Sequence, residues 1–224
     1  MNINDSWKQF IENSKYYGEM LDFISKEKDI APTKDKVFRF FNCDLNKCKE
    51  IVLGMDPYPS TYVKDGKILP VATGRSFEVE NVEKWTDKYK QKSLMMMFKA
   101  FCYQKYEKDL LIQELRKLIN EENFKYINIH DWFDKKEKEG TIFLNATLTT
   151  KINSSNSHYK IWEKFMNELI SYIVSINPNI KWHIWGEEAY NRIKELVPID
   201  MIYKTCHPAS RVNNNFVKEC KLRY

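Results

Sequence analysis

Polar side chains that could bind a flat, polar ligand stand at the ends of short apolar runs in this sequence. Asp56 and Tyr58 follow the run IVLGM, Asn145 stands inside TIFLNATL, and His207 comes directly after MIYKTC. A carboxylate can hold a water molecule or offset a developing positive charge. An amide carries a donor and an acceptor and can read the edge of a base, and a neutral imidazole can donate a hydrogen bond to a developing anion. Prolines on both sides of Tyr58 restrict its backbone and are expected to fix its ring.

The apolar runs beside these residues are typical of buried parallel strands. They are EIVLGM (50–55), TIFLNATL (141–148), IKWHIWG (180–186) and MIYKTC (201–206). Helical patterns separate them over 93–119, where we expect two helices, and over 158–176 and 187–197. Strands that alternate with helices predict an α/β fold with a short, mostly parallel, four-stranded sheet. Such sheets bind ligands outside the carboxyl ends of their strands, where Asp56, Asn145 and His207 stand.

The length of 224 residues predicts one domain over 1–224, with an N-terminal helical segment over 1–30. The charge run DKKEKEG (134–140) is expected to be a solvated loop.

A net charge of +5 permits an acidic partner without proving one. The five cysteines are scattered without a C-x-x-C pair, which indicates a reduced, intracellular protein without a cysteine-built zinc site. No signal peptide or membrane-spanning run is recognisable, so we expect the cytoplasm, or the nucleus in a eukaryotic or viral setting.

Each candidate residue has a plainer interpretation when it is taken alone. An Asp before a Pro, as at Asp56, is typical of a turn that follows a strand. Asn145 fits a turn or a cap, and His207 before a proline fits a surface loop. The functional interpretation therefore depends on the order and context of the residues together.

In that order, the segments resemble the uracil-DNA glycosylases of the family that carries a GQDPYH motif and a late HPSPLS loop. The resemblance runs from about Ala31 to Phe216. It is carried by GMDPYP (54–59), TGRSFEV (73–79), KSLMMMFKAF (92–101), GTIFLNATLTT (140–150), IWGEEAY (184–190) and CHPAS (206–210). The combination of DPYP with HPA is particularly similar to the poxvirus glycosylases, which also lack the histidine after the tyrosine.

The resemblance implies a role for each residue of the base pocket. Asp56 would orient the attacking water and stabilise the sugar cation, and His207 would donate to O2 of the departing uracil. Tyr58 would stand against C5 of the base, where thymine carries a methyl group. Phe77 would stack on the flipped base, and Asn145 would bind its O4 and N3 edge and so reject cytosine.

The resemblance also implies contacts around this pocket. Met55, in place of the family's glutamine, would bind substrate, with adjusted placement of the water. The expected DNA-binding residues are Pro59, Ser93, His158, Ser210 and Arg211. Arg211 is the nearest candidate for the family's intercalating leucine, and Glu187 replaces a phosphate-contacting serine.

These roles predict a monofunctional glycosylase that flips uracil out of DNA and hydrolyses its N-glycosidic bond, which initiates base excision repair. No metal or cofactor is expected. The expected partner is uracil-containing DNA, single- or double-stranded, and the resemblance also admits a proteinaceous inhibitor or a replication partner; no membrane is expected. A catalytically weak DNA-binding or processivity module on the same scaffold is the alternative. A third hypothesis, altered base specificity, conflicts with Tyr58, because a smaller residue would be needed to admit thymine.

Overall fold

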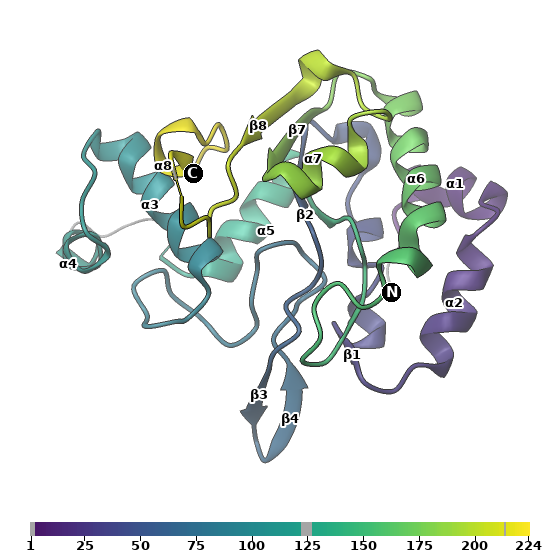
Figure 1. Cartoon of the computed structure of the whole chain (residues 1–224), viewed down its shortest axis with the longest axis horizontal. Helices are drawn as coiled ribbons and strands as arrows, with labels where there is room; N and C mark the ends of the chain where they lie inside the picture. The colour runs from purple at the N-terminus through teal and green to yellow at the C-terminus, as the bar shows by residue number, and fades with distance from the viewer. Residues whose placement is uncertain (1–2, 122–126, 213) are drawn as a thin grey trace.

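Four parallel strands form the central sheet, in the order β5–β2–β7–β8 (Figure 1). The computed structural model describes residues 3–121, 127–212 and 214–224. The strands of this sheet are β2 (Glu50–Gly54), β5 (Thr141–Asn145), β7 (Lys181–Trp185) and β8 (Ile202–Thr205). Each neighbouring pair is parallel. The predicted α/β fold class and the four predicted strands are therefore confirmed.

Helices cover both faces of the sheet, because alternate residues of each strand point to opposite sides. Ile51 and Leu53 of β2 belong to one apolar core, and Val52 between them belongs to the other. The first core includes α1 (Lys8–Asn13), α2 (Tyr17–Lys26), α6 (Tyr159–Ile176) and α7 (Glu187–Ile193). The second includes α3 (Lys92–Tyr106), α4 (Ile112–Glu121), α5 (Ile129–Glu139) and α8 (Phe216–Glu219). Figure 1 shows α6, α1 and α2 on one side of the strands and α3, α5 and α8 on the other.

The remaining elements are short. They are β1 (Ile30–Ala31), which pairs with β6 (Thr150–Lys151), and the 3-10 helices η1 (Asp5–Trp7), η2 (Lys34–Lys36), η3 (Arg39–Asn42), η4 (Leu45–Lys47) and η5 (Ile199–Met201). The N-terminal helical stripe is interrupted between α1 and α2. There the Ser14 hydroxyl accepts hydrogen bonds from the backbone N–H groups of Tyr16 (3.3 Å) and Tyr17 (3.1 Å), which starts the second helix.

The charged stretch 134–140 lies mostly in α5, so the predicted solvated loop is wrong. The Asn128 side chain caps this helix by accepting from two backbone N–H groups, at 2.8 and 3.2 Å. Lys136 is only 7% exposed and pairs with Glu50 at 3.1 Å. The charges thus have buried partners that the run of sequence letters does not reveal.

A β-hairpin follows the turn that carries Tyr58. It consists of β3 (Thr61–Lys64) and β4 (Lys67–Pro70), which are antiparallel. Asp65 and Gly66 connect the strands with φ values of 51° and 72°, which suits an Asp-Gly hairpin turn. The hairpin is a separate two-stranded sheet and projects away from the body of the molecule (Figure 1).

Candidate active site

The segments after β5 and β2 stay bonded to each other beyond the ends of the strands. Gly54 is the register partner of Asn145. Past this pair, the N–H of Ala146 donates to the Gly54 carbonyl at 2.9 Å and the N–H of Thr147 to the Met55 carbonyl at 2.9 Å. Asn145 and the turn that carries Asp56 therefore lie side by side at the carboxyl edge of the sheet.

The Asn145 amide is a buried polar group without a protein partner. The residue is 3% exposed, and within the described part of the chain no hydrogen bond reaches its side chain. A Cβ on Gly54 would stand only 2.3 Å from Asn145 Oδ1, so glycine is what lets the amide lie over the end of β2. Neither of its polar atoms is among the fully buried side-chain atoms of the described residues that lack a partner, so the amide keeps a narrow contact with solvent. A ligand that presents both an acceptor and a donor would satisfy it there.

The Asp56 carboxylate is held at one oxygen. The backbone N–H of Asn156 donates to its Oδ2 at 2.6 Å. Arg192 in turn donates to Asn156 Oδ1 at 3.0 Å and to Thr147 Oγ1 at 3.2 Å, which braces this loop from α7. Burial raises the pKa of Asp56, while the Asn156 N–H and the Arg192 guanidinium oppose the rise. An oriented carboxylate of this kind can hold a water molecule for attack.

Sequence reasoning did not identify Asn156 or Arg192. Asn156 has a φ of 59°, in the left-handed region that asparagine tolerates better than most residues. The asparagines of 153–156 were therefore a usable turn signal. No local pattern points to Arg192, because its role depends on how α7 packs against the loop.

The turn after Asp56 holds Tyr58 between backbone contacts. The Pro59 carbonyl accepts from the N–H of Asn153 at 2.8 Å. The Tyr58 ring is half-buried against the α3 side of the core, and its hydroxyl has no hydrogen-bond partner among the described residues. Burial raises the pKa of this phenol well above its usual range. Met55 is half-buried and packs on the opposite core.

Phe77 has a backbone conformation that is unfavourable for a residue with a side chain. Its φ is 66°, and its ring lies against Trp185 at the end of β7, with centroids 4.6 Å apart. Residues on both sides hold this conformation. The Ser76 hydroxyl donates to the Val52 carbonyl at 2.9 Å, and Arg75 donates to Glu78 at 2.9 Å. Strain of this kind persists only where the surroundings enforce it, and it often marks a functional site.

His207 follows β8 and is held as a neutral ring. Its Nδ1 accepts from the backbone N–H of Ala209 at 3.1 Å, so the ring proton of the neutral form is on Nε2. Burial lowers the pKa of His207. A Cβ on Gly186 would stand 3.1 Å from His207 Cβ, so glycine allows this close approach. Lys92 braces the loop by donating to the Ala209 carbonyl at 3.3 Å.

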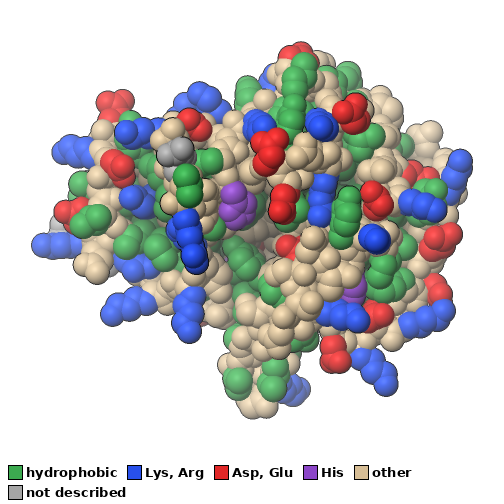
Figure 2. All heavy atoms as spheres, viewed as in Figure 1, with side chains coloured by type: hydrophobic (Ala, Val, Ile, Leu, Met, Phe, Trp, Pro, Cys, Tyr) green, Lys and Arg blue, Asp and Glu red, His purple; other side chains and the backbone are tan. Residues whose placement is uncertain are grey.

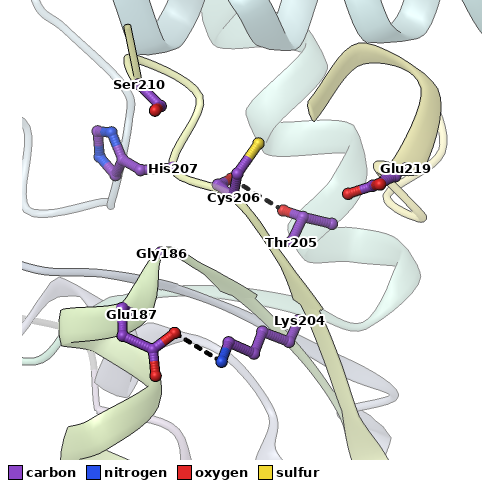
Figure 3. Close-up of a pocket in the computed structure, with 8 residues that line it drawn as sticks. All are labelled: Gly186, Glu187, Lys204, Thr205, Cys206, His207, Ser210 and Glu219. Atoms are coloured by element: carbon purple, nitrogen blue, oxygen red, sulfur yellow. Dashed lines mark hydrogen bonds and ion pairs between the residues drawn. The ribbon is translucent and has the colours of Figure 1, made fainter. Parts of the chain in front are cut away.

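Among the described residues, one cavity is lined by His207 and another by Tyr58, and neither is lined by Phe77 or Asn145. The first, of about 540 Å³, lies on the outer side of β8 and includes His207 and Ser210 (Figure 3). In that view the His207 ring points away from Glu219, and the Glu187 carboxylate turns to Lys204, 2.7 Å away. The second, of about 730 Å³, is lined by Tyr58, by Ser93 in the first turn of α3 and by Ala209.

The other residues that were expected to contact DNA differ in how exposed they are. Arg211 is exposed on the loop after His207, and Ser210 Oγ donates to the Val212 carbonyl at 2.9 Å. Val212 itself is 72% exposed, and sequence reasoning missed this apolar side chain at the loop tip. The structure does not place His158 where DNA could reach it. Its ring is 2% exposed, packs edge-on against Phe23 and shares a hydrogen bond with a threonine hydroxyl, because α6 begins beside the core.

Two general features of the described residues frame the site. No helix in 3–121, 127–212 or 214–224 is long and apolar enough to cross a membrane. Across the same residues, no group of three or more His, Cys, Asp or Glu side chains is arranged to hold a metal ion.

Comparisons with known proteins agree on one kind of relative. No protein-family model matches the chain. A uracil-DNA glycosylase from Francisella tularensis subsp. holarctica is 30% identical over 217 residues, which covers 91% of this chain and 84% of the relative. A mimivirus UNG variant solved in complex with UGI superposes with a TM-score of 0.69 at 24% identity, over 92% of this chain and 70% of that one. The wild-type UNG structure from Nitratifractor salsuginis has a TM-score of 0.69 at 16% identity, over 92% of this chain and 84% of that one.

Proposed function

Because the chain belongs to the uracil-DNA glycosylase family, we propose that the residues at the carboxyl edge of its sheet excise uracil from DNA by hydrolysis of the N-glycosidic bond. The base must leave the duplex to reach this edge, and a mispaired uracil is the less costly base to extrude. The products are free uracil and an abasic site, the starting point of base excision repair.

Asp56 and His207 act on the two sides of the bond that breaks. With Oδ2 held by Asn156, the Asp56 carboxylate positions the attacking water and offsets positive charge on the sugar. His207 presents its Nε2–H to O2 of uracil, where negative charge develops as the base departs. The bond electrons go to the uracil, which leaves as an anion, and the water supplies the hydroxyl of the sugar. The proton that the water gives up ends on the released uracil. A neutral histidine suits this donation, because its proton is preorganised and no charge is buried beforehand.

Base selection comes from three side chains. Asn145 pairs with O4 and N3 of uracil, and cytosine would leave its amide mispaired, which costs about 1–3 kcal/mol. Phe77 stacks on the flipped base, with Trp185 behind it. Tyr58 blocks the C5 methyl of thymine. The motif GMDPYP retains this tyrosine although Met55 and Pro59 differ from the family's residues, and Pro59 contributes through its backbone carbonyl, which accepts from Asn153.

One observation supports this proposal most strongly. His207, whose Nδ1 accepts from Ala209, and Asn145, which makes no hydrogen bond through its side chain to the described residues, stand at the same sheet edge as the Asp56 carboxylate, which Asn156 orients. β8 lies two strands from β2, so about 10 Å separates these strand ends, a span suited to a flat ligand held at both edges. A binding-only module would not need all three groups.

Around the pocket, we propose that the DNA backbone meets Ser93, Ser210 and Arg211. Val212, exposed beside Arg211, is the better candidate for an apolar side chain that enters the base stack. Glu187 pairs with Lys204 and so turns away from a phosphate. His158 supports the loop that holds Asp56 and does not contact DNA. A proteinaceous partner is a further proposal, since the mimivirus relative was solved in complex with UGI.

Release of uracil from a single-stranded oligonucleotide tests the proposed function. The wild-type chain, in the presence of a chelator, should produce free uracil and a site that breaks only after alkali treatment. The same oligonucleotide with thymine in place of uracil is the control. Asp56→Asn should lower the rate at least about 100-fold while the protein stays folded. Absence of alkali-labile sites at stoichiometric protein would refute the assignment.

A further inference from the structure

A lysine-lined cleft leads from Tyr58 toward the β3–β4 hairpin, outside the residues assigned to the base. Ser60, Thr61 and Val71 at the base of the hairpin form one wall of this cleft of about 730 Å³. The segment that leads into α3 forms the other wall with Lys88, Lys90 and Lys92. No Asp or Glu is among the described residues that line it.

The cleft lysines are available for an anionic ligand. Lys88 and Lys90 are exposed, and no carboxylate of the described residues pairs with either. Lys92 donates to the carbonyls of Ala209 and Ser210, which links the cleft to the loop that carries His207. A groove with charge of one sign attracts a phosphate backbone.

The hairpin exposes an apolar pair that the fold does not use. Val63 and Ile68 are cross-strand partners, and each is 72% exposed. Lys64 and Lys67 are the next pair toward the turn. Figure 2 shows the hairpin as a lobe that projects from the body, with hydrophobic side chains near its end. Their contact across the strands stabilises the hairpin, but at 72% exposure most of their apolar surface stays in water, where a partner could cover it.

We propose that the cleft and the hairpin together bind the DNA strand that flanks the extruded uracil, on one side only. Lys88 and Lys90 contact phosphates next to the flipped nucleotide. Val63 and Ile68 pack on sugars and bases further along the strand. A four-residue strand spans about 13 Å, so the hairpin extends the contact by a few nucleotides beyond the cleft. The proposal rests on the proposed function, because it takes the strand as entering from Tyr58.

The observations favour DNA over a protein as the occupant. The cleft is continuous with the wall of the base pocket at Tyr58, and its charge is complementary to a phosphate chain. The apolar pair is too small to be a protein interface by itself, but it suits a nucleic-acid strand already held by the lysines.

Two double variants and substrates of different reach test the proposal. Val63→Ser with Ile68→Ser removes the apolar pair, and Lys88→Gln with Lys90→Gln removes two cleft charges. Ile199→Ser and Lys49→Gln are matched controls. Both are exposed, and they lie before β8 and β2, at the opposite edge of the sheet. Each protein is assayed for kcat/KM on three single-stranded substrates: a minimal uracil oligonucleotide with one flanking nucleotide on each side, and versions extended by about ten nucleotides in the 5′ or the 3′ direction.

The serine double variant should match wild type on the minimal substrate and lose about 10-fold in kcat/KM on one of the two extended substrates. Its salt dependence should not change. The glutamine double variant should lose activity on the same extended substrate, with a slope of log kcat/KM against log salt that is shallower by about 1.4. The control variants should match wild type throughout.

Equal activity of wild type and the serine variant on both extended substrates would overturn the proposal and leave the hairpin to a protein partner. An equal loss on all three substrates would also overturn it, because the effect would then lie in the base pocket. Failure of the proposed function is a different result, since the wild-type chain would then release no uracil even from the minimal substrate.

Discussion

Replacement of Gly54 by alanine tests whether the Asn145 amide is part of the base pocket. Gly54 ends β2 directly opposite Asn145. An added Cβ would stand 2.3 Å from Asn145 Oδ1 and 2.9 Å from Ser76 Cβ, whereas ordinary contact begins at 3.4 Å. The amide must therefore move by about 1 Å, and a displacement of that size at a reacting site costs about 100-fold in rate.

The stability cost of this change should leave the protein folded. Oδ1 is the end of a side chain that can turn, so most of the overlap is relieved by moving the amide out of place. Overpacking of this kind costs about 1–3 kcal/mol of unfolding free energy, which leaves a typical domain folded at the assay temperature. We therefore expect kcat/KM for uracil release to fall about 100-fold with an intact unfolding transition.

Gly18→Ala is the matched control. Gly18 lies in α2, and nothing is within 4 Å of a Cβ added there. This variant should keep full activity and gain up to about 1 kcal/mol of stability. Uracil release and thermal unfolding measured on both variants check the reasoning. A folded Gly54→Ala protein with activity within about 3-fold of wild type would show that the Asn145 amide does not need its observed position.

Further variants test the remaining assignments. Asn145→Asp should shift activity toward cytosine and Tyr58→Ala should admit thymine; unchanged base choice in competition assays would contradict the pocket. Because burial lowers the pKa of His207 and its neutral form is needed, kcat/KM should hold as pH falls below 6.5 and drop only at lower pH; an acid limb at 6.5 that is absent in His207→Gln would contradict this. Arg75→Met should cost about 3–5 kcal/mol of unfolding free energy, since it removes the buried guanidinium that pairs with Glu78 at 2.9 Å and leaves this 1% exposed carboxylate to His130 at 3.0 Å and Arg39 at 3.6 Å; a loss under 1 kcal/mol would show that these two neighbours are sufficient.

The conformation of Phe77 depends on charges that lie far apart in the sequence. Arg75 binds Glu78 beside Phe77, and also Asp134 and Glu137 of α5. The Glu78 carboxylate also pairs with His130 of α5 at 3.0 Å and with Arg39 at 3.6 Å. The segment that carries the Phe77 ring is thus anchored to α5 through buried ion pairs, which resist local opening.

The sequence alone predicted the fold class correctly and placed the candidate polar residues at one edge of the sheet. Four continuous apolar runs are long enough only for strands, and parallel strands place Asp56, Asn145 and His207 at one edge whatever the details of packing. The resemblance carried by the same residues then led to the family. These inferences depend on the order of residues within short segments, and folding does not change that order.

Only the tertiary structure decided how these residues are held and which of them are exposed. The Asn156 N–H on Asp56, the Ala209 N–H on His207 and the helical state of 134–139 depend on contacts between distant segments. His158 was expected at the DNA surface and is buried, because a sequence position does not show which way a ring packs. The sequence also did not predict that Val63 and Ile68 are exposed on the hairpin, because exposure is a property of the packed molecule and not of a residue type.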